Sequence, residues 1–370
     1  MPLICSETEV YHILDVLGKG TFGKVVKCCR QSDGELVAVK ILNYNAIGSQ
    51  LIKNELKMVT TMFQSNLKRS HIVHFFEAFC DTTRHYLVFE MLEKSLYQLQ
   101  NENSFKPLPM RNIRTVTCQM LTALAKLREL AIIHADLKPE NIMIVNQQRF
   151  PFRVKLIDFG SSGIFSEVRC VKEPYIQSRF YRAPEILLGL PFCEKVDMWS
   201  LGCVMAELYL GWPLYPGKSE FDQVRYICET QGLPHSHLLN IATKTNKFFQ
   251  LTKDQHSAPA WELKPSVWGP NGDIDEHRKY AFSSLDQLCN LNITKKNKTS
   301  CSEDAAAKIT DCHCMVELIK RMLALISHQR ITPDAALRHP FITLTHLDSP
   351  DTQSYYDLSL EELQKALIQI

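Results

Sequence analysis

The sequence has almost no excess charge of either sign, because 42 basic residues face 40 acidic ones over 370 positions. Nucleic-acid-binding surfaces usually need a basic excess, so we expect no direct nucleic-acid partner. Long uncharged apolar runs are missing too. The most apolar stretch, residues 196–215, contains Asp197 and Glu207 and ends with Gly211 and Pro213. Such a stretch is typical of a buried core helix, so we expect no membrane span.

The amino terminus has neither the basic start nor the apolar run of a signal peptide. We therefore expect an intracellular chain, cytoplasmic with the nucleus as the alternative, since no compact basic import signal is present. A framework of paired cysteines is also absent. The 13 cysteines are scattered, often in apolar contexts, which is typical of reduced core thiols. Cys312, His313 and Cys314, with Cys301 upstream, could imitate a zinc site, but they have no second spaced pair, so a structural role is favoured.

The sequence has the composition of a globular enzyme, with 45% apolar and 22% charged residues. Its first part, from Tyr11 to Phe89, is mostly strand-like. Four runs are rich in β-branched and aromatic residues, namely 25–28, 36–41, 72–76 and 86–89.

One helix interrupts these strands between Leu51 and Phe63. Glu55 lies on the apolar face of this helix, where a carboxylate is costly unless a cation meets it. Lys40, in the preceding strand, is the expected partner. The expected buried face consists of residues at helical spacing, namely Ile52, Leu56, Val59 and Phe63.

After Met91 the pattern becomes helical, with a long helix expected around residues 113–127. We therefore expect an α+β protein with two lobes. A small antiparallel β-sheet lobe with one helix would span residues 11–92, and a large, mainly helical lobe residues 93–347. The large lobe would contain a polar, irregular insertion at about residues 233–308, with a flexible loop near 292–304.

Residues 348–370 would form a C-terminal tail. Within it, Ser359-Leu360-Glu361-Glu362 matches a helix-capping box. The tail would pack on its own domain, with docking of a partner as the alternative. The expected apolar stripe consists of Leu360, Leu363, Leu367 and Ile370.

A glycine-rich loop, Gly18–Val25, lies between the first two expected strands. Its pattern is weak by itself, because dinucleotide-binding folds share it, but there a helix follows the third glycine and here residues 25–28 form a strand. No Gly-Lys-Ser/Thr closes the loop, so it is not a Walker A loop either. We expect a flap over nucleotide phosphates. The candidate nucleotide-binding residues are Leu17, Gly18, Lys19, Gly20, Thr21, Phe22, Gly23, Lys24 and Val25, with Ala38 and Lys40 in the next strand.

The strongest signal is the octapeptide His134–Asn141, which is followed by Asp158-Phe159-Gly160. Asp136 can accept the proton of a substrate hydroxyl, and Lys138 can neutralise the γ-phosphate. Asn141 and Asp158 offer a neutral and a charged oxygen, which suits a Mg²⁺ ion that also binds phosphates and water.

Lys40 completes this set, because its charge can hold the α- and β-phosphates of ATP while Glu55 orients it. Each residue taken alone is also consistent with a structural role, since Asp136 or Asn141 can simply cap a turn. Their order and spacing make that improbable and predict phosphoryl transfer from ATP to a hydroxyl group.

With these motifs the sequence resembles eukaryotic protein kinases over about residues 11–347. Ala183-Pro184-Glu185 resembles the motif that ends the activation segment, and Arg330 resembles the arginine that pairs with the glutamate of that motif, here Glu185. Residues 197–202 resemble the core-helix motif. The resemblance implies the bilobal protein kinase fold, ATP and Mg²⁺ as cofactors, protein substrates and a monomeric enzyme.

The resemblance also implies how adenine is bound. Phe89 would be the gatekeeper, and Glu90, Met91 and Leu92 would form the hinge. Residues 137–141 resemble the catalytic loop of serine/threonine kinases, which implies serine and threonine hydroxyls as acceptors.

Narrower features resemble one branch of the family. Residues 175–185 are similar to cyclin-dependent, mitogen-activated and dual-specificity tyrosine-regulated kinases. Within that branch, His134-Ala135-Asp136-Leu137 and residues 187–194 resemble the homeodomain-interacting protein kinases. Arg182 implies a preference for proline after the target residue, as in the branch.

Ala135 departs from the common pattern, because many kinases have an arginine there that binds a phosphate on the activation segment. As in the family it resembles, Tyr175 would be autophosphorylated in cis, with Arg179 and Arg182 binding the phosphate. The alternative is an unmodified tyrosine that packs locally. Gly163, where close relatives carry alanine, would loosen the segment without removing a catalytic group.

A catalytically weak pseudokinase scaffold is the competing function. That function predicts the loss of a lysine, base or metal ligand. The sequence retains all five such residues, Lys40, Glu55, Asp136, Asn141 and Asp158.

Overall fold

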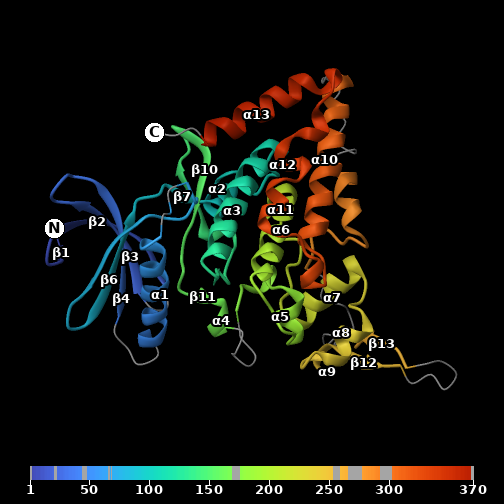
Figure 1. The fold of residues 1–370 in the computed structure, drawn as a ribbon, viewed down its shortest axis with the longest axis horizontal. Helices are drawn as coiled ribbons and strands as arrows, with labels where there is room; N and C mark the ends of the chain where they lie inside the picture. Colours follow the sequence, from blue (N-terminus) through green and yellow to red (C-terminus); the bar gives the residue numbers. More distant parts are fainter. Residues whose placement is uncertain are drawn as a thin grey trace.

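The computed structural model describes residues 2–20, 23–43, 48–65, 67, 69–168, 176–252, 259–265, 277–291 and 302–367. A sheet-rich lobe and a larger helical lobe are joined by the segment after residue 90 (Figure 1). The expected bilobal α+β kinase fold is confirmed.

The small lobe is built on a six-stranded antiparallel sheet with strand order β1-β2-β3-β4-β6-β5. Alternating apolar residues on β3, β4 and β6 bury one face, with Val26, Val39 and Val88 fully enclosed. The strands are β1 (Leu3–Cys5), β2 (Val10–Gly20), β3 (Gly23–Arg30), β4 (Leu36–Asn43), β5 (Phe75–Cys80) and β6 (Arg84–Glu90).

Helix α1 (Gly48–Phe63) is the one helix that the structure describes in this lobe. Ile52, Glu55 and Val59 are buried on one face, as expected. Phe63 is 57% exposed, so the expectation of its burial is wrong. The helix ends at this residue, and its ring meets Phe75 edge to face at the margin of the lobe.

The expected strand over residues 72–76 is only partly present. Strand β5 begins at Phe75. Ile72 forms a single bridge with Leu156 of the large lobe, and the Val73 N–H donates to the Leu156 carbonyl (3.0 Å). Residues 72 and 73 therefore link the two lobes and do not belong to the sheet.

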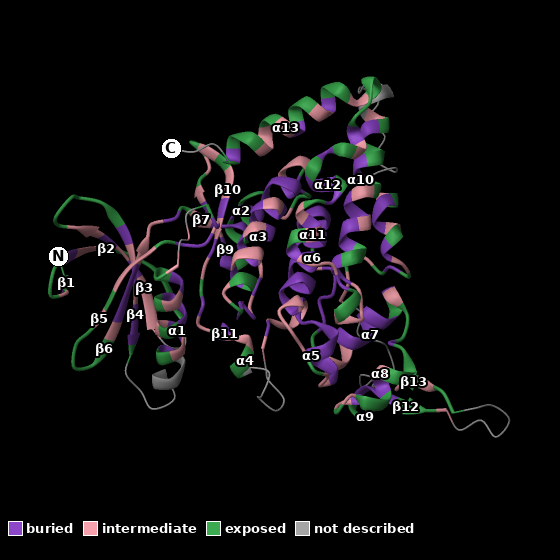
Figure 2. Ribbon diagram, viewed as in Figure 1, coloured by how far each residue is buried: buried purple, intermediate pink, exposed green. Residues whose placement is uncertain are grey.

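The core of the large lobe is formed by α3 (Met110–Glu129) and α6 (Lys195–Leu210). Helix α6 is buried along nearly its whole length (Figure 2), which confirms the expected core helix. The elements before α7 are β7 (Lys94–Ser95), α2 (Leu96–Glu102), β8 (Ile132–Ile133), η1 (Pro139–Asn141), β9 (Ile142–Asn146), β10 (Phe150–Leu156), β11 (Gly163–Ile164), α4 (Phe165–Val168), η2 (Arg179–Tyr181) and α5 (Pro184–Leu188).

The region expected to be an irregular insertion contains more structure than its composition indicated. Two short helices and the hairpin β12–β13 follow α7 (Glu220–Gln231), and the chain is helical again from Ser302. The expected irregular end at about residue 308 is therefore wrong, because apolar residues of α10 (Ser302–Met322) pack against α6. Residues 292–301 of the expected loop lie outside the described part. The elements here are α8 (Ser236–Ile241), α9 (Thr245–Phe248), β12 (Phe249–Leu251), β13 (Trp261–Leu263) and η3 (Leu285–Leu291).

The tail folds as α13 (Gln353–Leu367), which packs against α3 and β10 of its own domain. Ser359 is buried within this helix, so the expected capping box is wrong: the helix begins at Gln353, whereas a cap at Ser359 would start it at Leu360. Leu360 and Leu363 are partly buried, whereas Leu367 is 41% exposed and Ile370 lies outside the described residues. Before α13 come η4 (Ser327–Gln329), α11 (Pro333–Leu337), α12 (Pro340–Thr343), η5 (Thr345–Leu347) and η6 (Pro350–Thr352).

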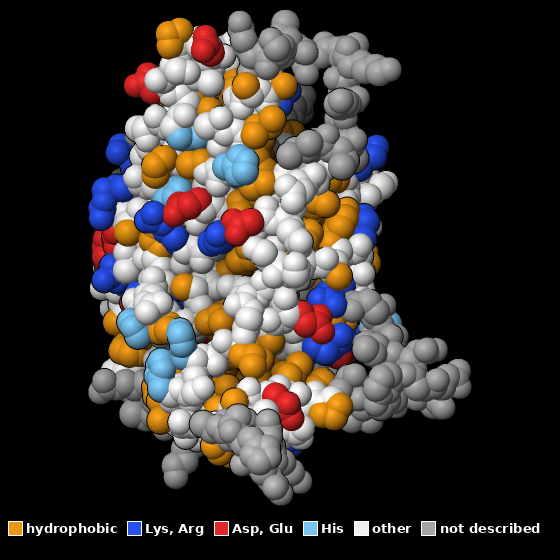
Figure 3. Space-filling view, turned by 90° about the vertical axis from the view of Figure 1, so that its right-hand side faces the viewer, with side chains coloured by type: hydrophobic (Ala, Val, Ile, Leu, Met, Phe, Trp, Pro, Cys, Tyr) orange, Lys and Arg blue, Asp and Glu red, His pale blue; other side chains and the backbone are white. Residues whose placement is uncertain are grey.

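The surface of the large lobe remote from the sheet carries acidic and basic side chains next to one another (Figure 3). Among the described residues, no helix is long and apolar enough to span a membrane, and no cluster of three metal-binding side chains is found. Cys312 is buried, with its sulfur 3.2 Å from the Tyr209 hydroxyl, while His313 is exposed. Cys301 lies outside the described residues.

Candidate active site

The core helix α6 fixes the loop that carries the expected base. The backbone N–H groups of His134 and Ala135 donate to the carboxylate of Asp197 (2.8 and 2.9 Å). Asp197 is 2% exposed, and Ala135 has a left-handed backbone (φ 63°). Two charge-assisted hydrogen bonds at a buried site are strong and directional, so this carboxylate sets the loop conformation that presents Asp136.

The carboxylate of Asp136 has three side-chain partners: Asn141, whose amide donates to Oδ2 (3.2 Å), and Lys138 and Ser178, which also contact each other. Its Oδ2 accepts from the Lys138 ammonium (2.7 Å), and its Oδ1 accepts from the Ser178 hydroxyl (2.8 Å). Lys138 also lies 3.1 Å from the Ser178 oxygen. The structure thus brings the expected base and the expected γ-phosphate cation together. Ser178 could not be named from the sequence, because a single serine 42 residues from Asp136 has no characteristic spacing.

The two expected metal ligands lie beside this base. Asn141 is 6% exposed, and its amide N–H donates to the backbone carbonyl of Asp136 (2.8 Å). That hydrogen bond leaves the Asn141 Oδ1 as the atom that can face a cation. Asp158 follows β10, and its side chain is 44% exposed. One amide oxygen and one carboxylate fit a Mg²⁺ ion whose other ligands are phosphate oxygens and water.

Lys40 of β4 joins the two lobes at the site. Its ammonium lies 2.6 Å from Glu55 Oε1 and 3.0 Å from Asp158 Oδ1, so the expected pair with Glu55 is confirmed. Burial opposes the charge on this lysine, but the two carboxylates outweigh burial and raise the pKa of Lys40. Burial would also raise the pKa of Asp158, yet the Lys40 charge lowers it, which favours the ionised form that the expected role as a metal ligand requires.

The described part of the glycine-rich loop consists of strand ends, since Gly18 and Gly20 lie at the end of β2 and Gly23 begins β3. A Cβ on Gly18 or Gly20 would meet no atom within 4 Å, so the backbone is open to the close approach of a phosphate. A Cβ on Gly23 would lie 1.9 Å from the Ile41 carbonyl oxygen, so the packing of β3 on β4 requires glycine there. Thr21 and Phe22 lie outside the described residues.

The sheet register brings the remaining nucleotide candidates together. Lys19 pairs with Lys24, Val25 is opposite Lys40, and Ala38 is opposite Phe89. Leu17, before the glycines, is 45% exposed. These residues therefore line one end of the same sheet.

The hinge candidates Glu90 and Leu92 can bind adenine only through their backbone, because their side chains are engaged elsewhere. The Glu90 carboxylate is engaged by the Lys155 ammonium (2.5 and 2.7 Å) and by the His74 N–H (2.5 Å). The Leu92 side chain is 4% exposed and belongs to the main core. The Phe89 side chain is half-buried at the end of β6, where a gatekeeper is expected.

The activation segment is held to the catalytic loop through the backbone. The Gln177 N–H donates to the Ala135 carbonyl (2.9 Å). Tyr175 lies outside the described residues. Gly163, expected to loosen the segment, pairs with Ile133 in a two-stranded sheet.

Both arginines expected to bind a phosphate already have protein acceptors. Arg182 is 2% exposed and donates to the carbonyls of Ile176 (3.0 Å) and Gln177 (2.7 Å) and to Glu220 (3.0 Å). Arg179 donates to the Lys218 carbonyl (2.5 Å). A phosphate on Tyr175 would have to compete with these partners. By contrast, the expected pair of Arg330 with Glu185 is present as a buried two-bond contact (2.7 and 2.9 Å).

Comparison with protein families agrees with this geometry, because a model described as "Protein kinase domain" matches residues 11–342. The chain belongs to the protein kinase family. Within it, the chain is 58% identical to human homeodomain-interacting protein kinase 4 over 99% of its own length and 61% of that relative. It is 47% identical to mouse homeodomain-interacting protein kinase 2 over 93% of its length and 29% of that relative.

The chain is thus a kinase of the homeodomain-interacting type, and the expected family is confirmed. Residues 164–169 and 171–175 resemble the fourth, shortest member, in agreement with the high identity to that kinase. The chain spans about three fifths of the length of the kinase 4 relatives that it matches.

Proposed function

We propose that this kinase transfers the γ-phosphate of ATP to serine and threonine hydroxyls of proteins. The observation that carries the proposal is the convergence of groups from both lobes on one site: Lys40 contacts Asp158, and Asp136 contacts Lys138 and Asn141. Phosphoryl transfer needs positioning and charge neutralisation, and these five side chains supply both.

Each residue has a distinct role in this proposal. Asp136 accepts the proton of the attacking hydroxyl at its carboxylate, and Lys138 offsets charge on the phosphoryl oxygens. Lys40, oriented by Glu55, binds the α- and β-phosphates. Asn141 and Asp158 would hold Mg²⁺, which supplies charge neutralisation on the phosphates when bound with ATP.

A radiolabel transfer assay on a protein substrate tests the activity. Asp136→Asn should lower the rate by about 10²–10⁴-fold, because it removes the general base. Asp351→Asn is the matched control, since Asp351 is exposed in the tail region. Equal labelling by the parent and Asp136→Asn would contradict the proposal and favour the alternative of a pseudokinase scaffold.

The preference for proline after the target residue is supported by the backbone at Gln177. This residue is left-handed (φ 66°), and its carbonyl accepts from Arg182 Nη2 (2.7 Å). The carbonyl is therefore already engaged, and an N–H from a bound substrate would have to share it with Arg182. Proline has no N–H to leave unsatisfied, so it would bind there with the smallest penalty.

Paired peptides that differ only in the residue after serine test this preference. The Ser-Pro peptide should have the higher kcat/KM, by about 5–30-fold, which corresponds to one unsatisfied N–H of about 1–2 kcal/mol. Equal kcat/KM values for Ser-Pro and Ser-Ala peptides would contradict a proline-directed kinase without affecting the assignment of the base.

We also propose cis autophosphorylation of Tyr175. Its support is Ala135, which removes the arginine route to the catalytic loop, together with the backbone tether at Gln177. Mass spectrometry of protein expressed in bacteria should find phosphate on Tyr175, and its absence from an active preparation would contradict the proposal. Asp136→Asn co-expressed with the active chain should stay unmodified if the reaction is in cis.

A monomer in the cytoplasm, with the nucleus as the alternative compartment, completes the proposal. Light scattering of the purified chain should give a mass near 42.5 kDa. Fluorescence imaging of a tagged chain tests the compartment, and a purely nuclear signal would contradict the cytoplasmic assignment.

A further inference from the structure

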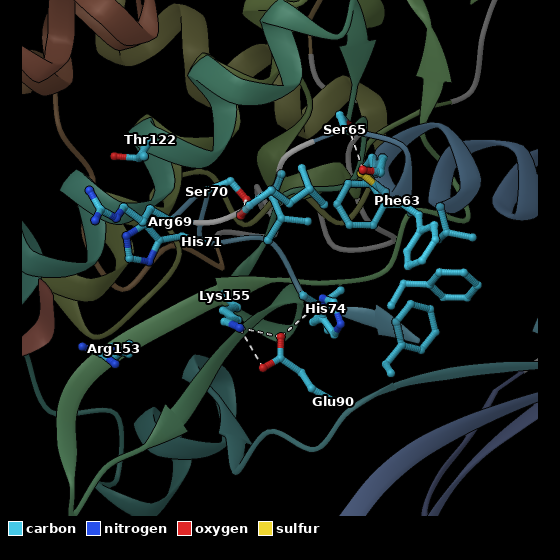
Figure 4. A pocket seen from close by; sticks show the side chains of 18 of the residues that line it. Phe63, Ser65, Arg69, Ser70, His71, His74, Glu90, Thr122, Arg153 and Lys155 are labelled. Atoms are coloured by element: carbon cyan, nitrogen blue, oxygen red, sulfur yellow. Dashed lines mark hydrogen bonds and ion pairs between the residues drawn. The ribbon is translucent and has the colours of Figure 1, made fainter. Parts of the chain in front are cut away.

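A cavity between the two lobes has the gatekeeper candidate Phe89 and the hinge candidate Glu90 in its lining, but none of the six residues proposed to carry out the phosphoryl transfer (Figure 4). Its volume is about 1240 Å³. The end of α1, residues 67–76, α3, β10 and the end of α13 surround it. This volume exceeds the roughly 300–1,000 Å³ of typical small-molecule sites, so an extended ligand fits it better.

One end of the cavity is cationic. Arg69, His71 and Arg153 lie on the same side in Figure 4, with Lys155 nearby. Burial lowers the pKa of His71 to about 4, and the positive charges of Lys155 and Arg153 make a smaller contribution in the same direction.

Arg153 is the most informative member of this group. Its Nε–H donates to the Ala366 carbonyl (2.8 Å), and its guanidinium lies 4.3 Å from the centre of the Phe150 ring. Within the described part of the chain no carboxylate forms an ion pair with it, and partial burial lowers its pKa. A partly desolvated cation without a counter-charge gains free energy when a carboxylate binds.

Lys155 differs, because the Glu90 carboxylate neutralises it within the cavity wall (2.5 Å). Glu35 is the other acidic lining residue. The free positive charge is therefore small and local, which suits a few carboxylates better than a polyanion such as nucleic acid.

The other end of the cavity is aromatic. Phe63, which is 57% exposed, meets Phe75 edge to face with ring centres 6.0 Å apart. Phe75 in turn lies 5.6 Å from the Phe89 ring. Rings exposed on a cavity wall can bury an apolar side chain of a ligand, at about 25 cal/mol per Å² removed from water.

We propose that this cavity docks an acidic peptide segment of a protein substrate, with carboxylates at Arg153 and an apolar residue against Phe63. The inference rests on the proposed function, because the docked protein is a substrate only if the kinase phosphorylates its hydroxyl groups. The peptide occupies a site apart from Asp136, so binding and phosphorylation can be measured separately.

Fluorescence anisotropy tests the docking directly. The probe is a labelled peptide of Asp, Glu and Leu residues without Ser, Thr or Tyr, added to the full chain. Arg153→Glu should weaken binding by at least about 10-fold, as expected for loss of a charge-assisted hydrogen bond. Phe63→Ala should weaken it as well, and added salt should weaken the parent complex.

Arg149→Glu is the matched control. Arg149 lies on the same hairpin and also faces the Phe150 ring (5.1 Å), but it does not line the cavity. Its variant should bind the peptide as the parent does. Equal loss in both variants would overturn the proposal, because it would show non-specific attraction. Parent-like binding by Arg153→Glu would overturn it too.

Two further measurements complete the test. In NMR titrations, the pKa of His71 should rise from about 4 when the acidic peptide is bound. A short Ser-Pro peptide should be phosphorylated equally by the parent and Arg153→Glu, while the same target fused to the acidic segment should lose its lower KM in the variant. An equal loss for both targets, or tighter binding of an oligonucleotide with the same dependence on Arg153, would overturn the docking proposal.

Failure of the two proposals can be told apart. If no peptide is phosphorylated yet peptide binding still depends on Arg153 and not on Arg149, the proposed function fails and the docking surface stands. If phosphorylation is normal and peptide binding is absent, the docking proposal fails alone.

Discussion

At the scale of single residues, Ala135 shows how one small side chain changes the attachment of a whole segment. It removes the arginine that many kinases use to hold a phosphorylated activation segment. In the structure the Ala135 backbone contacts the segment at Gln177, whose N–H donates to the Ala135 carbonyl, while the Ala135 N–H donates to Asp197 of α6. The segment is therefore tethered in the unphosphorylated chain.

Gln177 should accordingly be sensitive to substitution. It is 6% exposed, and its amide donates to Val196 and Ser200 and accepts from the Ala183 N–H. Gln177→Ala should lower the free energy of unfolding by about 1–3 kcal/mol, because buried partners lose their hydrogen bonds. Thermal unfolding measures the effect, with the exposed Gln353→Ala as control. An unchanged melting temperature would show that the amide network is not stabilising.

A second residue-scale prediction concerns pH. Glu207 of α6 is 4% exposed, and burial raises its pKa from 4.5 to about 7. The Tyr181 hydroxyl donates to it (2.7 Å), and the charge of Glu140 adds to the upward shift. The folded state therefore binds more protons than the unfolded state between about pH 4.5 and pH 7, so stability falls as the pH rises through this window.

Glu207→Gln removes this titration. The variant should be more stable than the parent at about pH 8, by on the order of 3 kcal/mol, and close to it at about pH 4.5. Unfolding midpoints of both proteins across this range measure the difference, with the exposed Glu361→Gln as control. A parent–variant difference that is constant with pH would contradict a raised pKa for Glu207.

At the scale of elements, the tail helix α13 shows how local signals can mislead. Its sequence offers a capping box at Ser359, but the helix runs from Gln353 to Leu367 through that residue. Contacts with residues distant in the sequence hold the helix in place: the Tyr355 hydroxyl donates to Asp311 (2.8 Å), and Arg153 donates to the Ala366 carbonyl (2.8 Å).

Removal of this helix should destabilise the kinase. Deletion of residues 350–370 should lower the melting temperature, since it uncovers α3 and β10 and leaves Asp311 without the Tyr355 hydroxyl. Tyr355→Phe should cost about 1.5–3 kcal/mol, the usual value for a hydrogen bond to a charged group. Leu358→Ala is the control, since Leu358 is 47% exposed. An unchanged melting temperature after the deletion would indicate a tail that only docks partners.

Other elements were predictable because their pattern and their environment agree. The alternation in β4 and the helical spacing in α3 match the faces that are buried in the structure. Phe63 and residues 72–74 were mispredicted, because a helix end and a link between lobes depend on distant partners.

At the scale of the whole molecule, the two lobes meet through Lys40, Glu55 and Asp158. ATP with Mg²⁺ should therefore raise the melting temperature, by an amount that corresponds to about 2.7 kcal/mol when free nucleotide is 100 times Kd. Asp158→Asn should reduce the effect of Mg²⁺, and a chelator should abolish that part in the parent.

Lys40→Met should reduce the stabilisation by nucleotide further, because it removes the cation for the α- and β-phosphates. Lys126→Met, a surface substitution outside the site, is the matched control. A full stabilisation by ATP and Mg²⁺ in both site variants would contradict the assignment of these residues.

The sequence by itself determined the chemistry of the site. Lys40, Glu55, Asp136, Lys138, Asn141 and Asp158 could be named from it, because phosphoryl transfer restricts residue type and spacing so narrowly. It also determined the lobes and their main helices, since these follow from local hydrophobic periodicity.

Only the tertiary structure decided what depends on contacts between distant residues. Ser178 meets Asp136 across 42 positions, the Gln177 N–H donates to the Ala135 carbonyl, and Arg182 is engaged by carbonyls and Glu220. The cavity at Arg153 likewise needs several segments that lie far apart in the sequence. No local sequence pattern predicts such long-range contacts, because they stabilise the protein only once folding has brought the distant partners together.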